Sequence, residues 1–480
     1  MKKAALHNLG CKVNAYETQA MQQLLEAAGY EIVAFHEKAD VYVINTCSVT
    51  NIADRKSRQM LHRARRQNPQ AVIVAAGCYV QTAGPDVGKE GIADIILGNN
   101  KKEHLVSMIE RYQREQATVT DWEDVNQGKK EYERLAVSRA AGHTRAFLKI
   151  QDGCNQFCSY CVIPYARGRV RSRRPQEVLE EVRRLAASGC KEIVLTGIHL
   201  SSYGMGMDEP DEKLQKEHAG FDMDGSPQEG HAGFDLNGSP QKRNACFDPD
   251  GPRQELLQLL RLIHEVDGIC RIRLGSLEPG IITRPFAQAL AGMEKICPHF
   301  HLSLQSGCDT VLDRMNRKYH TAEFAEKCEI LRACFDRPAI TTDVIVGFPG
   351  ETEAEFAATR EFLEQVHFYE MHIFKYSVRK GTRAAAMDGQ VAEPVKAARS
   401  AQLLALGERM SAQYREGFAG EVKDVLLEEP FVLDGRRYEA GYTKEYVKVA
   451  VVSEQNRANC VVRGEITGHL TRDIYLMVEF

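Results

Sequence analysis

The first 100 residues alternate between short apolar runs and longer amphipathic stretches. Each apolar run is rich in small or β-branched residues and ends in glycine or a polar residue, whereas stretches such as 16–29 and 51–68 repeat their apolar positions with the period of a helix. The apolar runs lie at 3–10, 40–46, 71–77 and 93–98. Short buried strands that alternate with helices are typical of a parallel sheet covered on both faces. We therefore expect an N-terminal α/β domain over residues 1–121.

A second alternation follows a polar and charged segment, 122–142, that we interpret as a linker. Its strand-like runs lie at 145–151, 192–198, 271–276, 299–305, 339–347 and 369–376. Helical patterns such as 175–189 and 322–335 lie between most of them. Six β/α units fall short of a closed eight-stranded barrel, so we predict a partial (β/α)6 barrel over 143–415. Ligands of such folds bind at the carboxyl ends of the strands, where glycine and polar residues gather in this sequence.

Two further regions depart from this alternation. Residues 416–480 change to short alternating strands, which predict a small C-terminal all-β barrel. An insertion at about 207–250 carries a repeat of 13 residues, HAGFDMDGSPQEG followed by HAGFDLNGSPQKR, rich in glycine and aspartate. This period is too short for a solenoid. We therefore interpret the insertion as a mobile loop born of duplication, without a chemical role.

The composition is that of a soluble globular protein, since 43% of residues are hydrophobic and 27% are charged. No apolar run is long enough to span a bilayer and the first residues lack a cleavable signal, so we expect a cytoplasmic protein without a membrane partner. Fourteen cysteines in a reducing compartment favour thiolate ligands or buried thiols over disulfides. The net charge of −4 hides basic clusters at 55–66 and 167–174. They suggest a polyanion docked at one place, and the alternative is two solvated arginine-rich surfaces.

Three cysteines stand close together in the stretch DGCNQFCSYC, just past the first predicted strand of the barrel. We name Cys154, Cys158 and Cys161 the barrel trio. A 4Fe–4S cluster usually takes four thiolates, so three leave one iron open to an external ligand. Zinc is the alternative, but a structural zinc site is closed and needs a fourth ligand, which no nearby Cys-x-x-Cys or His-x-x-x-His supplies. The spacing therefore favours an iron–sulfur cluster with an open position.

Three other cysteines each follow a predicted strand of the N-terminal sheet. We name Cys11, Cys47 and Cys78 the N-terminal trio. Because the carboxyl ends of parallel strands gather at one edge of a sheet, these thiols can converge in space. The alternative is three buried cysteines of apolar character. Their equivalent positions favour a second ligand set that again leaves one iron free.

The pattern Cys-x-x-x-Cys-x-Tyr-Cys on a six-unit β/α barrel resembles the radical S-adenosylmethionine superfamily. With the N-terminal trio added, the chain resembles the methylthiotransferase family of that superfamily, over nearly its whole length outside the insertion. The other stretches that carry the resemblance are CVIPYARGRVRSR, LTGIHLSSYG, RLGSLEP, HLSLQSGCDTVLDRMNRKY and DVIVGFPGET. The resemblance implies an N-terminal cluster domain, a radical barrel and a C-terminal TRAM domain, which is an RNA-binding β-barrel.

The stretch around the first cysteine, LGCKVNAYET, resembles the branch that acts on N6-threonylcarbamoyladenosine in tRNA, 3′ to the anticodon. Relatives that act on isopentenyladenosine tend toward Gln-Met-Asn after that cysteine, and those that act on ribosomal protein S12 tend toward Pro-Lys-Asn. Lys12-Val13-Asn14 fits neither pattern. The resemblance thus implies insertion of a methylthio group at C2 of N6-threonylcarbamoyladenosine, with the other two substrates as alternatives. An alternative of another class is a non-catalytic iron–sulfur or zinc RNA-binding protein.

By this resemblance, the barrel trio holds a 4Fe–4S cluster that cleaves S-adenosylmethionine, and the N-terminal trio holds an auxiliary 4Fe–4S cluster that carries the sulfur. One S-adenosylmethionine methylates that sulfur, and another gives the radical that attacks C2 of the adenine. Six residues at or near predicted strand ends are candidate cofactor contacts, each with an ordinary turn or packing role as the alternative. They are Tyr160, Gly197, Ser276, Glu278, Gln305 and Gly347. We expect the remaining cysteines, such as Cys328 and Cys334, in the core.

RNA binding needs cations, and the C-terminal barrel is a poor phosphate binder by charge. It has eight Arg or Lys against eleven Asp or Glu between 417 and 480. The clusters at 55–66 and 167–174 are stronger candidates, and we hypothesise that Arg167 to Arg174 contact the anticodon stem-loop of the tRNA, aided by stacking aromatic residues. The reaction that the resemblance implies also needs an external electron donor and an external sulfur source.

Overall fold

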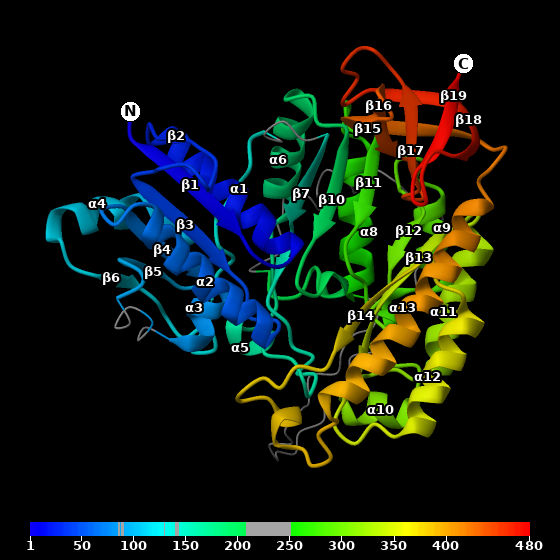
Figure 1. Ribbon diagram of the computed structural model, residues 1–480, viewed down its shortest axis with the longest axis horizontal. Coiled ribbons are helices and arrows are strands. Elements are labelled where there is room, and N and C mark those ends of the chain that lie inside the picture. Colours follow the sequence, from blue (N-terminus) through cyan, green and yellow to red (C-terminus); the bar gives the residue numbers. More distant parts are fainter. Residues whose placement is uncertain (85–86, 88–90, 129, 140–143, 208–250) are drawn as a thin grey trace, which may run out of the picture.

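The computed structural model describes residues 1–84, 87, 91–128, 130–139, 144–207 and 251–480. The insertion expected at about 207–250, which we predicted to be a mobile loop, lies almost wholly outside the described residues. The described chain forms an N-terminal sheet domain, a central open barrel and a small C-terminal barrel, coloured from blue through green to red in Figure 1. The predicted fold class is confirmed.

The N-terminal domain is a six-stranded parallel sheet in the order β2-β1-β3-β4-β5-β6. Its strands are β1 Lys3–Asn8, β2 Glu31–Ile32, β3 Val41–Thr46, β4 Val72–Gly77, β5 Ile95–Leu97 and β6 Val119–Asp121. Helices α1 (Lys12–Ala27) and α4 (Leu105–Glu115) cover one face, and α2 (Asn51–Gln67) and α3 (Cys78–Ala83) cover the other. Every residue of β3 and β4 is buried, as expected for strands packed on both sides.

The central unit has six strands in two parallel halves, β7-β10-β11 and β12-β13-β14. They are β7 Arg145–Lys149, β10 Glu192–Thr196, β11 Arg271–Leu274, β12 His299–His301, β13 Ala339–Val346 and β14 Glu370–Lys375. Isolated parallel bridges from Ile272 to Ile296 and from Leu277 to Leu302 join the halves. The six strands therefore form one curved sheet whose edges, β7 and β14, do not pair with each other.

Helices cover the outer side of this curved sheet (Figure 1). They are α6 Pro175–Ala187, α8 Gly251–His264, α9 Arg284–Ala291, α11 Thr321–Cys334, α12 Glu353–Val366 and α13 Glu393–Glu416. Alternate strand residues such as Phe300, Ile340 and Val344 belong to the main hydrophobic core beneath these helices. Since successive side chains of a strand point to opposite faces, the intervening residues such as His301 and Asp343 face the concave side.

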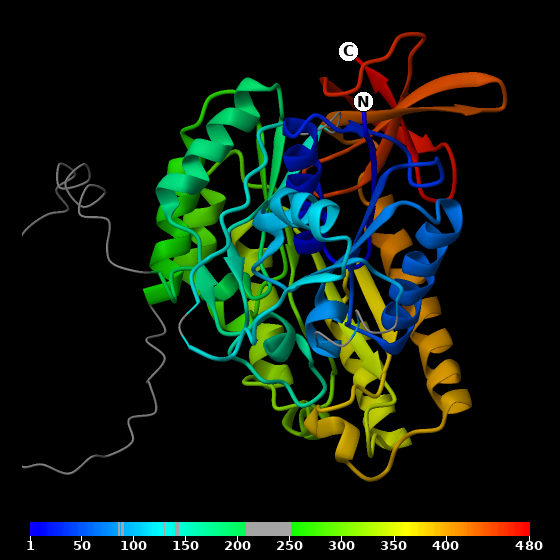
Figure 2. The ribbon, with the colours of Figure 1, turned by 90° about the vertical axis from the view of Figure 1, so that its left-hand side faces the viewer.

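The C-terminal unit is a closed five-stranded barrel in the order β15-β16-β17-β19-β18. Its strands are β15 Val422–Leu433, β16 Arg436–Tyr442, β17 Lys448–Val452, β18 Val461–His469 and β19 Tyr475–Glu479. It contacts the amino ends of the central strands: Arg145 donates to the Tyr446 hydroxyl at 2.7 Å and Arg271 donates to the carbonyl of Tyr442 at 2.7 Å. Both views place it at that end of the central barrel (Figures 1 and 2).

The N-terminal domain lies across the gap between the two free edges of the central sheet. At one edge α1 packs against β7. Beyond the other edge, Arg379 contacts the Ser48 hydroxyl at 2.8 Å and the Asp54 carboxylate at 2.7 Å. The segment after β6 also packs tightly, since Val137 lies in the main core and its amide donates to Glu181 at 2.9 Å. The concave side of the central sheet thus faces the N-terminal domain.

Candidate functional site

The barrel trio lies in the loop after β7 and the short strand β8 (Gln151–Asp152), at the carboxyl end of the central sheet. The loop folds back on helix α5 (Ile163–Arg167), and the amide of Cys154 donates to the carbonyl of Gly168 at 3.1 Å. Gly153 has a φ of +73°, and a Cβ at this position would overlap the carbonyl oxygen of Arg169. Glycine is therefore required directly before Cys154.

The three thiols of the barrel trio are electrostatic neighbours in a desolvated site. Burial, together with interaction with Cys158, raises the pKa of Cys154 and of Cys161 to about 12. The guanidinium of Arg317 acts in the opposite direction, and its Nη1 lies 3.1 Å from the sulfur of Cys158. Metal binding requires thiolates, so Arg317 would offset part of the negative charge that a bound centre creates.

The N-terminal trio lies at the carboxyl ends of β1, β3 and β4, which are adjacent strands. Gly10 has a φ of +105°, and a Cβ there would lie 2.8 Å from the sulfur of Cys47, so glycine lets the Cys11 loop approach that thiol. Burial, together with the neighbouring Cys78 and Cys11 thiols, raises the pKa of Cys47 to about 12. The structure thus brings these three cysteines, distant in sequence, to one place.

Cys11 combines exposure to solvent with close protein neighbours. Its thiol is exposed to solvent, whereas Cys47 and Cys78 are buried. Nevertheless, desolvation by the surrounding protein raises the pKa of Cys11. Cys11 is therefore open to solvent although protein groups lie close around its thiol.

One buried arginine joins the two trios. Arg167 is the last residue of α5, and its guanidinium interacts electrostatically with Cys78 and with Cys11. The same group donates to Asn14 Oδ1 at 2.6 Å and to Asp152, which precedes the barrel trio, at 3.1 Å. A single short helix therefore contacts the loops that carry both trios.

The donor chemistry of each trio fits an iron–sulfur cluster better than a single zinc ion. Within the described ranges, neither trio has its three sulfur atoms within 4.8 Å of one another. Tetrahedral zinc with Zn–S bonds of about 2.3 Å would bring sulfur pairs to about 3.8 Å. Wider spacing suits thiolates that bind separate irons of a cube. Each trio could thus hold a 4Fe–4S cluster with one iron free of protein thiolate.

The comparisons with known proteins agree with this architecture. Residues 3–98 match Uncharacterized protein family UPF0004, and residues 148–363 match the Radical SAM superfamily. The chain is 39% identical over 468 residues to the threonylcarbamoyladenosine tRNA methylthiotransferase MtaB of Bacillus subtilis, covering 97% of this chain and 94% of that protein. The chain belongs to the radical S-adenosylmethionine methylthiotransferase family.

Other relatives of this methylthiotransferase carry two different names. A threonylcarbamoyladenosine tRNA methylthiotransferase MtaB of Thermotoga maritima is 34% identical, covering 93% of this chain and 91% of that protein. A tRNA-2-methylthio-N(6)-dimethylallyladenosine synthase of Pelotomaculum thermopropionicum is 32% identical, covering 89% and 87%. Among solved structures, the radical S-adenosylmethionine methyltransferase TsrM of Kitasatospora setae aligns with a TM-score of 0.51 at 15% identity, covering 80% of this chain and 77% of that one. This last likeness concerns the fold alone.

Three candidate cofactor contacts of this methylthiotransferase lie beside the barrel trio. The ring of Tyr160 meets that of Phe348 edge-on, with centroids 6.5 Å apart, and Gly347 directly precedes Phe348. The carboxylate of Glu278 accepts two hydrogen bonds of 2.7 Å from Arg317, the guanidinium that also contacts the barrel trio. A carboxylate, an aromatic ring and a glycine backbone therefore border the same loop.

The other three candidates lie at strand ends around this loop. Gly197 follows β10, and a Cβ there would lie 2.8 Å from Gln151 Oε1. Gln305 has a φ of +74°, and its amide donates to the carbonyl of Asp343 at 2.9 Å. Ser276 is exposed just beyond β11 and stands outside this set of contacts.

Sequence reasoning missed two residues of the site, Arg317 and His199. The Nε2 atom of His199 lies 3.2 Å from Gln156 Nε2 in the barrel-trio loop and 3.9 Å from Glu278. Burial lowers the pKa of His199, so its ring is neutral and can accept as well as donate a proton. Both residues stand inside stretches that carry the family resemblance, which is the signal that could have identified them.

The basic cluster at 167–174 is not an exposed surface. Arg167, Arg171 and Arg173 are buried, and each has a carboxylate partner. The hypothesis that this run as a whole contacts tRNA is therefore wrong for these three, because their guanidinium groups are not available to phosphates. Arg169 and Arg174 are exposed.

The other basic cluster is exposed along one helix. On α2, the residues Arg55, Lys56, Arg63 and Arg66 are exposed, and we name them the α2 basic face. Arg65 of the same helix is instead paired with Asp94 at 2.7 Å. The α2 basic face begins next to the loop of Cys47 and is the stronger candidate for an RNA contact.

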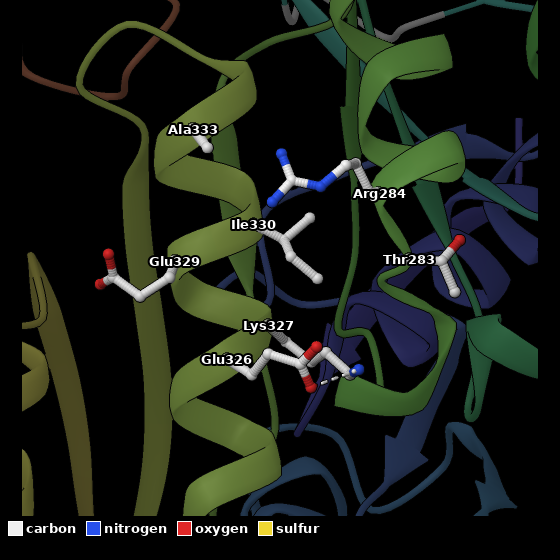
Figure 3. Close-up of a pocket in the computed structure, with 7 residues that line it drawn as sticks. All are labelled: Thr283, Arg284, Glu326, Lys327, Glu329, Ile330 and Ala333. Carbon is white, nitrogen blue, oxygen red and sulfur yellow. Dashed lines mark hydrogen bonds and ion pairs between the residues drawn. The ribbon is translucent and has the colours of Figure 1, made fainter.

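A groove of about 460 Å³ lies elsewhere, on the outer wall between α9 and α11. Arg284, Lys327 and Ile330 line it, and Figure 3 shows the lining side chains along α11 and at the start of α9. It includes no cysteine and lies on the side of the sheet opposite the concave face, so we do not assign the chemistry to it. Across the described residues, no helix has both the length and the apolar character needed to cross a bilayer.

Proposed function

We propose that this protein is a radical S-adenosylmethionine tRNA methylthiotransferase that inserts a methylthio group at C2 of N6-threonylcarbamoyladenosine, 3′ to the anticodon. The observation that carries the proposal is the pair of cysteine trios joined by Arg167. Relatives named for this activity at 39%, 35% and 34% identity support the choice of substrate, compared with 32% for relatives named for dimethylallyladenosine.

Each trio would hold one 4Fe–4S cluster, and S-adenosylmethionine would bind at the open iron of the barrel trio. When bound, these groups supply the electron that cleaves S-adenosylmethionine and the sulfur that is transferred. The protein supplies positioning and charge. Arg317 offsets thiolate charge at the barrel trio, and Arg167 does so at the N-terminal trio. Glu278 offers an acceptor to the methionyl ammonium group, and the ring of Tyr160 offers an apolar wall.

The remaining candidate contacts follow from backbone geometry. Gly197 and Gly347 directly follow β10 and β13, where the main chain packs closely against the side chains of Gln151 and Lys396, and Gln305 lies beyond the end of β12. Ser276 lies at the end of β11 and its hydroxyl is open to solvent. These residues surround the carboxyl ends of the strands, where ligands of β/α folds bind.

The partners follow from this activity. The tRNA anticodon stem-loop would dock on the α2 basic face and on Arg169 and Arg174, with the C-terminal barrel as a further RNA contact of the TRAM type. An external electron donor and an external sulfur source complete the reaction. Since tRNA is modified in the cytoplasm, we place the protein there, without a membrane partner.

Anaerobic reconstitution tests the proposal. We expect about eight irons per chain and release of 5′-deoxyadenosine, with about four irons left after Cys154→Ala and also after Cys47→Ala. The Cys47→Ala variant should still cleave S-adenosylmethionine, whereas Cys154→Ala should not. Cys460→Ala, at an exposed cysteine of the C-terminal barrel, is the matched control and should match the wild type.

Mass spectrometry of tRNA nucleosides identifies the substrate. A strain that lacks the protein should lose the methylthio form of N6-threonylcarbamoyladenosine alone. Loss of the methylthio form of isopentenyladenosine, or of methylthio ribosomal protein, would support the alternative substrates instead. A chain with neither the expected iron nor 5′-deoxyadenosine release would be a non-catalytic RNA-binding protein.

A further inference from the structure

Three ionisable side chains meet on the concave face of the central sheet, outside the cysteine loops. His301 of β12, Asp343 of β13 and His372 of β14 place one nitrogen or oxygen atom each within 4.8 Å of one another. They come from adjacent parallel strands, and Asp343 is the register partner of His372. We name these residues the concave triad. Neither the cysteine chemistry nor the family resemblance assigns them a role.

Contacts with neighbouring side chains hold the concave triad in place. His301 is buried, and its Nδ1 lies 2.9 Å from the Thr341 hydroxyl while its Nε2 lies 3.3 Å from Asp343 Oδ2. The rings of His301 and His372 stack with centroids 5.7 Å apart. Burial decreases across the triad: the Asp343 side chain is 29% exposed and His372 is exposed. The triad is therefore buried at His301 and open at His372, as expected for a surface that binds a ligand.

The concave triad is linked through Asp343 to a candidate cofactor contact and to the residue that follows Cys11. The carbonyl of Asp343 accepts the amide of Gln305, a candidate cofactor contact. Lys12, directly after Cys11, interacts electrostatically with Asp343. Lys12 is also accessible to solvent.

We propose that the concave triad and Lys12 form the subsite that binds the N6 substituent of the substrate adenosine and that selects a polar substituent over an apolar one. The inference rests on the proposed function. In the threonylcarbamoyl group, N–H and O–H donors suit Asp343, carbonyl oxygens suit the imidazole N–H of His372, and the carboxylate suits the ammonium of Lys12. C2 and N6 lie on different edges of adenine, so a base with C2 toward the N-terminal trio directs its substituent away from it.

The same chemistry disfavours the dimethylallyl group of the related enzymes. A purely apolar substituent would desolvate a carboxylate and two imidazoles without returning a hydrogen bond, which weakens its binding. Sites built to hydrogen-bond a substrate group reject analogues that lack it far more strongly than apolar sites reject an extra methylene. The concave triad thus gives a physical reason for a choice that overall identity separates only weakly.

The test compares three forms of one tRNA, with threonylcarbamoyladenosine, unmodified adenosine or dimethylallyladenosine at the target position. The variants His372→Ala, Asp343→Asn and Lys12→Gln are reconstituted with iron and sulfide beside the wild type. Each should lower kcat/KM on the threonylcarbamoyl tRNA by about 10- to 150-fold, the value of a hydrogen bond to a charged group. The preference for the threonylcarbamoyl tRNA over the unmodified tRNA should fall by the same factor. Iron content and S-adenosylmethionine binding should not change. His320→Ala, at an exposed histidine away from this face, is the control.

His372 is exposed, so its replacement leaves the core intact and keeps the test meaningful if Asp343→Asn folds poorly. If His372→Ala and Lys12→Gln retain the wild-type preference among the three tRNAs, the inference is overturned while the proposed function stands. If the wild type modifies none of the three, the proposed function itself fails. The triad also has the composition of a two-histidine, one-carboxylate metal site. One equivalent of zinc bound by the cluster-loaded wild type and lost in His372→Ala, with tRNA preference unchanged, would likewise overturn the inference.

Discussion

Removal of the buried charge of Arg167 should loosen the contact between the two cysteine-bearing units. Its guanidinium donates to Glu17 at 2.8 Å, to Asp152 at 3.1 Å and to Asn14 at 2.6 Å, and none of the charged partners is exposed. Removing one member of a buried ion pair costs about 3–5 kcal/mol. Lys149 remains beside both carboxylates, at 2.8 Å and 3.0 Å, so for Arg167→Met we expect the lower end, about 3 kcal/mol.

The effect should be local, since a chain of several domains does not unfold in one step. Hydrogen exchange measured by mass spectrometry should therefore show faster exchange in α1 and α5 of Arg167→Met, with the C-terminal barrel unchanged. The double variant Arg167→Met/Glu17→Gln also removes the carboxylate that contacts this guanidinium, and a double-mutant cycle should give a coupling energy of about 1–2 kcal/mol between the two residues. Arg167→Lys retains a charge but not the fork that spans Glu17, Asp152 and Asn14, and should fall between the two.

The pH dependence provides an independent check. Burial raises the pKa of Glu17, but Arg167, Lys102 and Lys149 together outweigh burial and hold that pKa well below its usual value of 4.5. A carboxyl group with a depressed pKa in the folded state stabilises it fully above pH 4.5 and loses this contribution as pH falls below that value. The stability difference between the wild type and Arg167→Met should thus narrow in acid. Equal exchange in α1 for the two proteins, or additive effects in the cycle, would refute the reasoning.

Three shorter predictions concern other contacts of the same units. Arg379→Ala removes the contacts with Ser48 and Asp54, so amide exchange at the start of α2 should quicken by about tenfold while α6 keeps its rate. Gly10→Ala places a Cβ 2.8 Å from the sulfur of Cys47 at a φ of +105°, so iron content should fall to about four per chain while 5′-deoxyadenosine release persists; unchanged iron would contradict this. With glutamine at all four positions of the α2 basic face, the slope of the logarithm of the tRNA binding constant against the logarithm of the salt concentration should become shallower by about three. An unchanged slope would exclude this face as the docking surface.

The parts of the structure that sequence reasoning anticipated are those with a local period. Apolar runs of strand length predicted both parallel sheets, because a strand buried on two faces leaves an unbroken apolar stretch. The position of Cys11, Cys47 and Cys78 after such runs predicted that strand ends would gather them. The short strands β2 and β6 carried no such signal, since two or three residues are too few to establish a period.

The parts that sequence reasoning did not anticipate depend on pairing between distant residues. The sequence predicted a basic surface cluster of arginines between 167 and 174. Instead, Arg167 is paired with Glu17 from a different domain, and Arg173 is paired with Glu181. The register that brings His301, Asp343 and His372 together depends on the order of three strands in space. A period of two tells which face a residue occupies, but not which residue of another strand stands beside it.

The buried ion network explains how two separate units can hold two reactive centres in one geometry. Glu17 comes from α1 of the N-terminal domain, and Lys149 and Asp152 come from the strands that lead to the barrel trio. Such networks contribute little net stability, because desolvation of the charges offsets most of their attraction. Their geometry is nevertheless restrictive, since a displacement of the α1 interface would leave charges unpaired in a desolvated place. A purely apolar contact between α1 and β7 would tolerate sliding, whereas this network fixes one register, and with it the distance between the N-terminal and barrel trios.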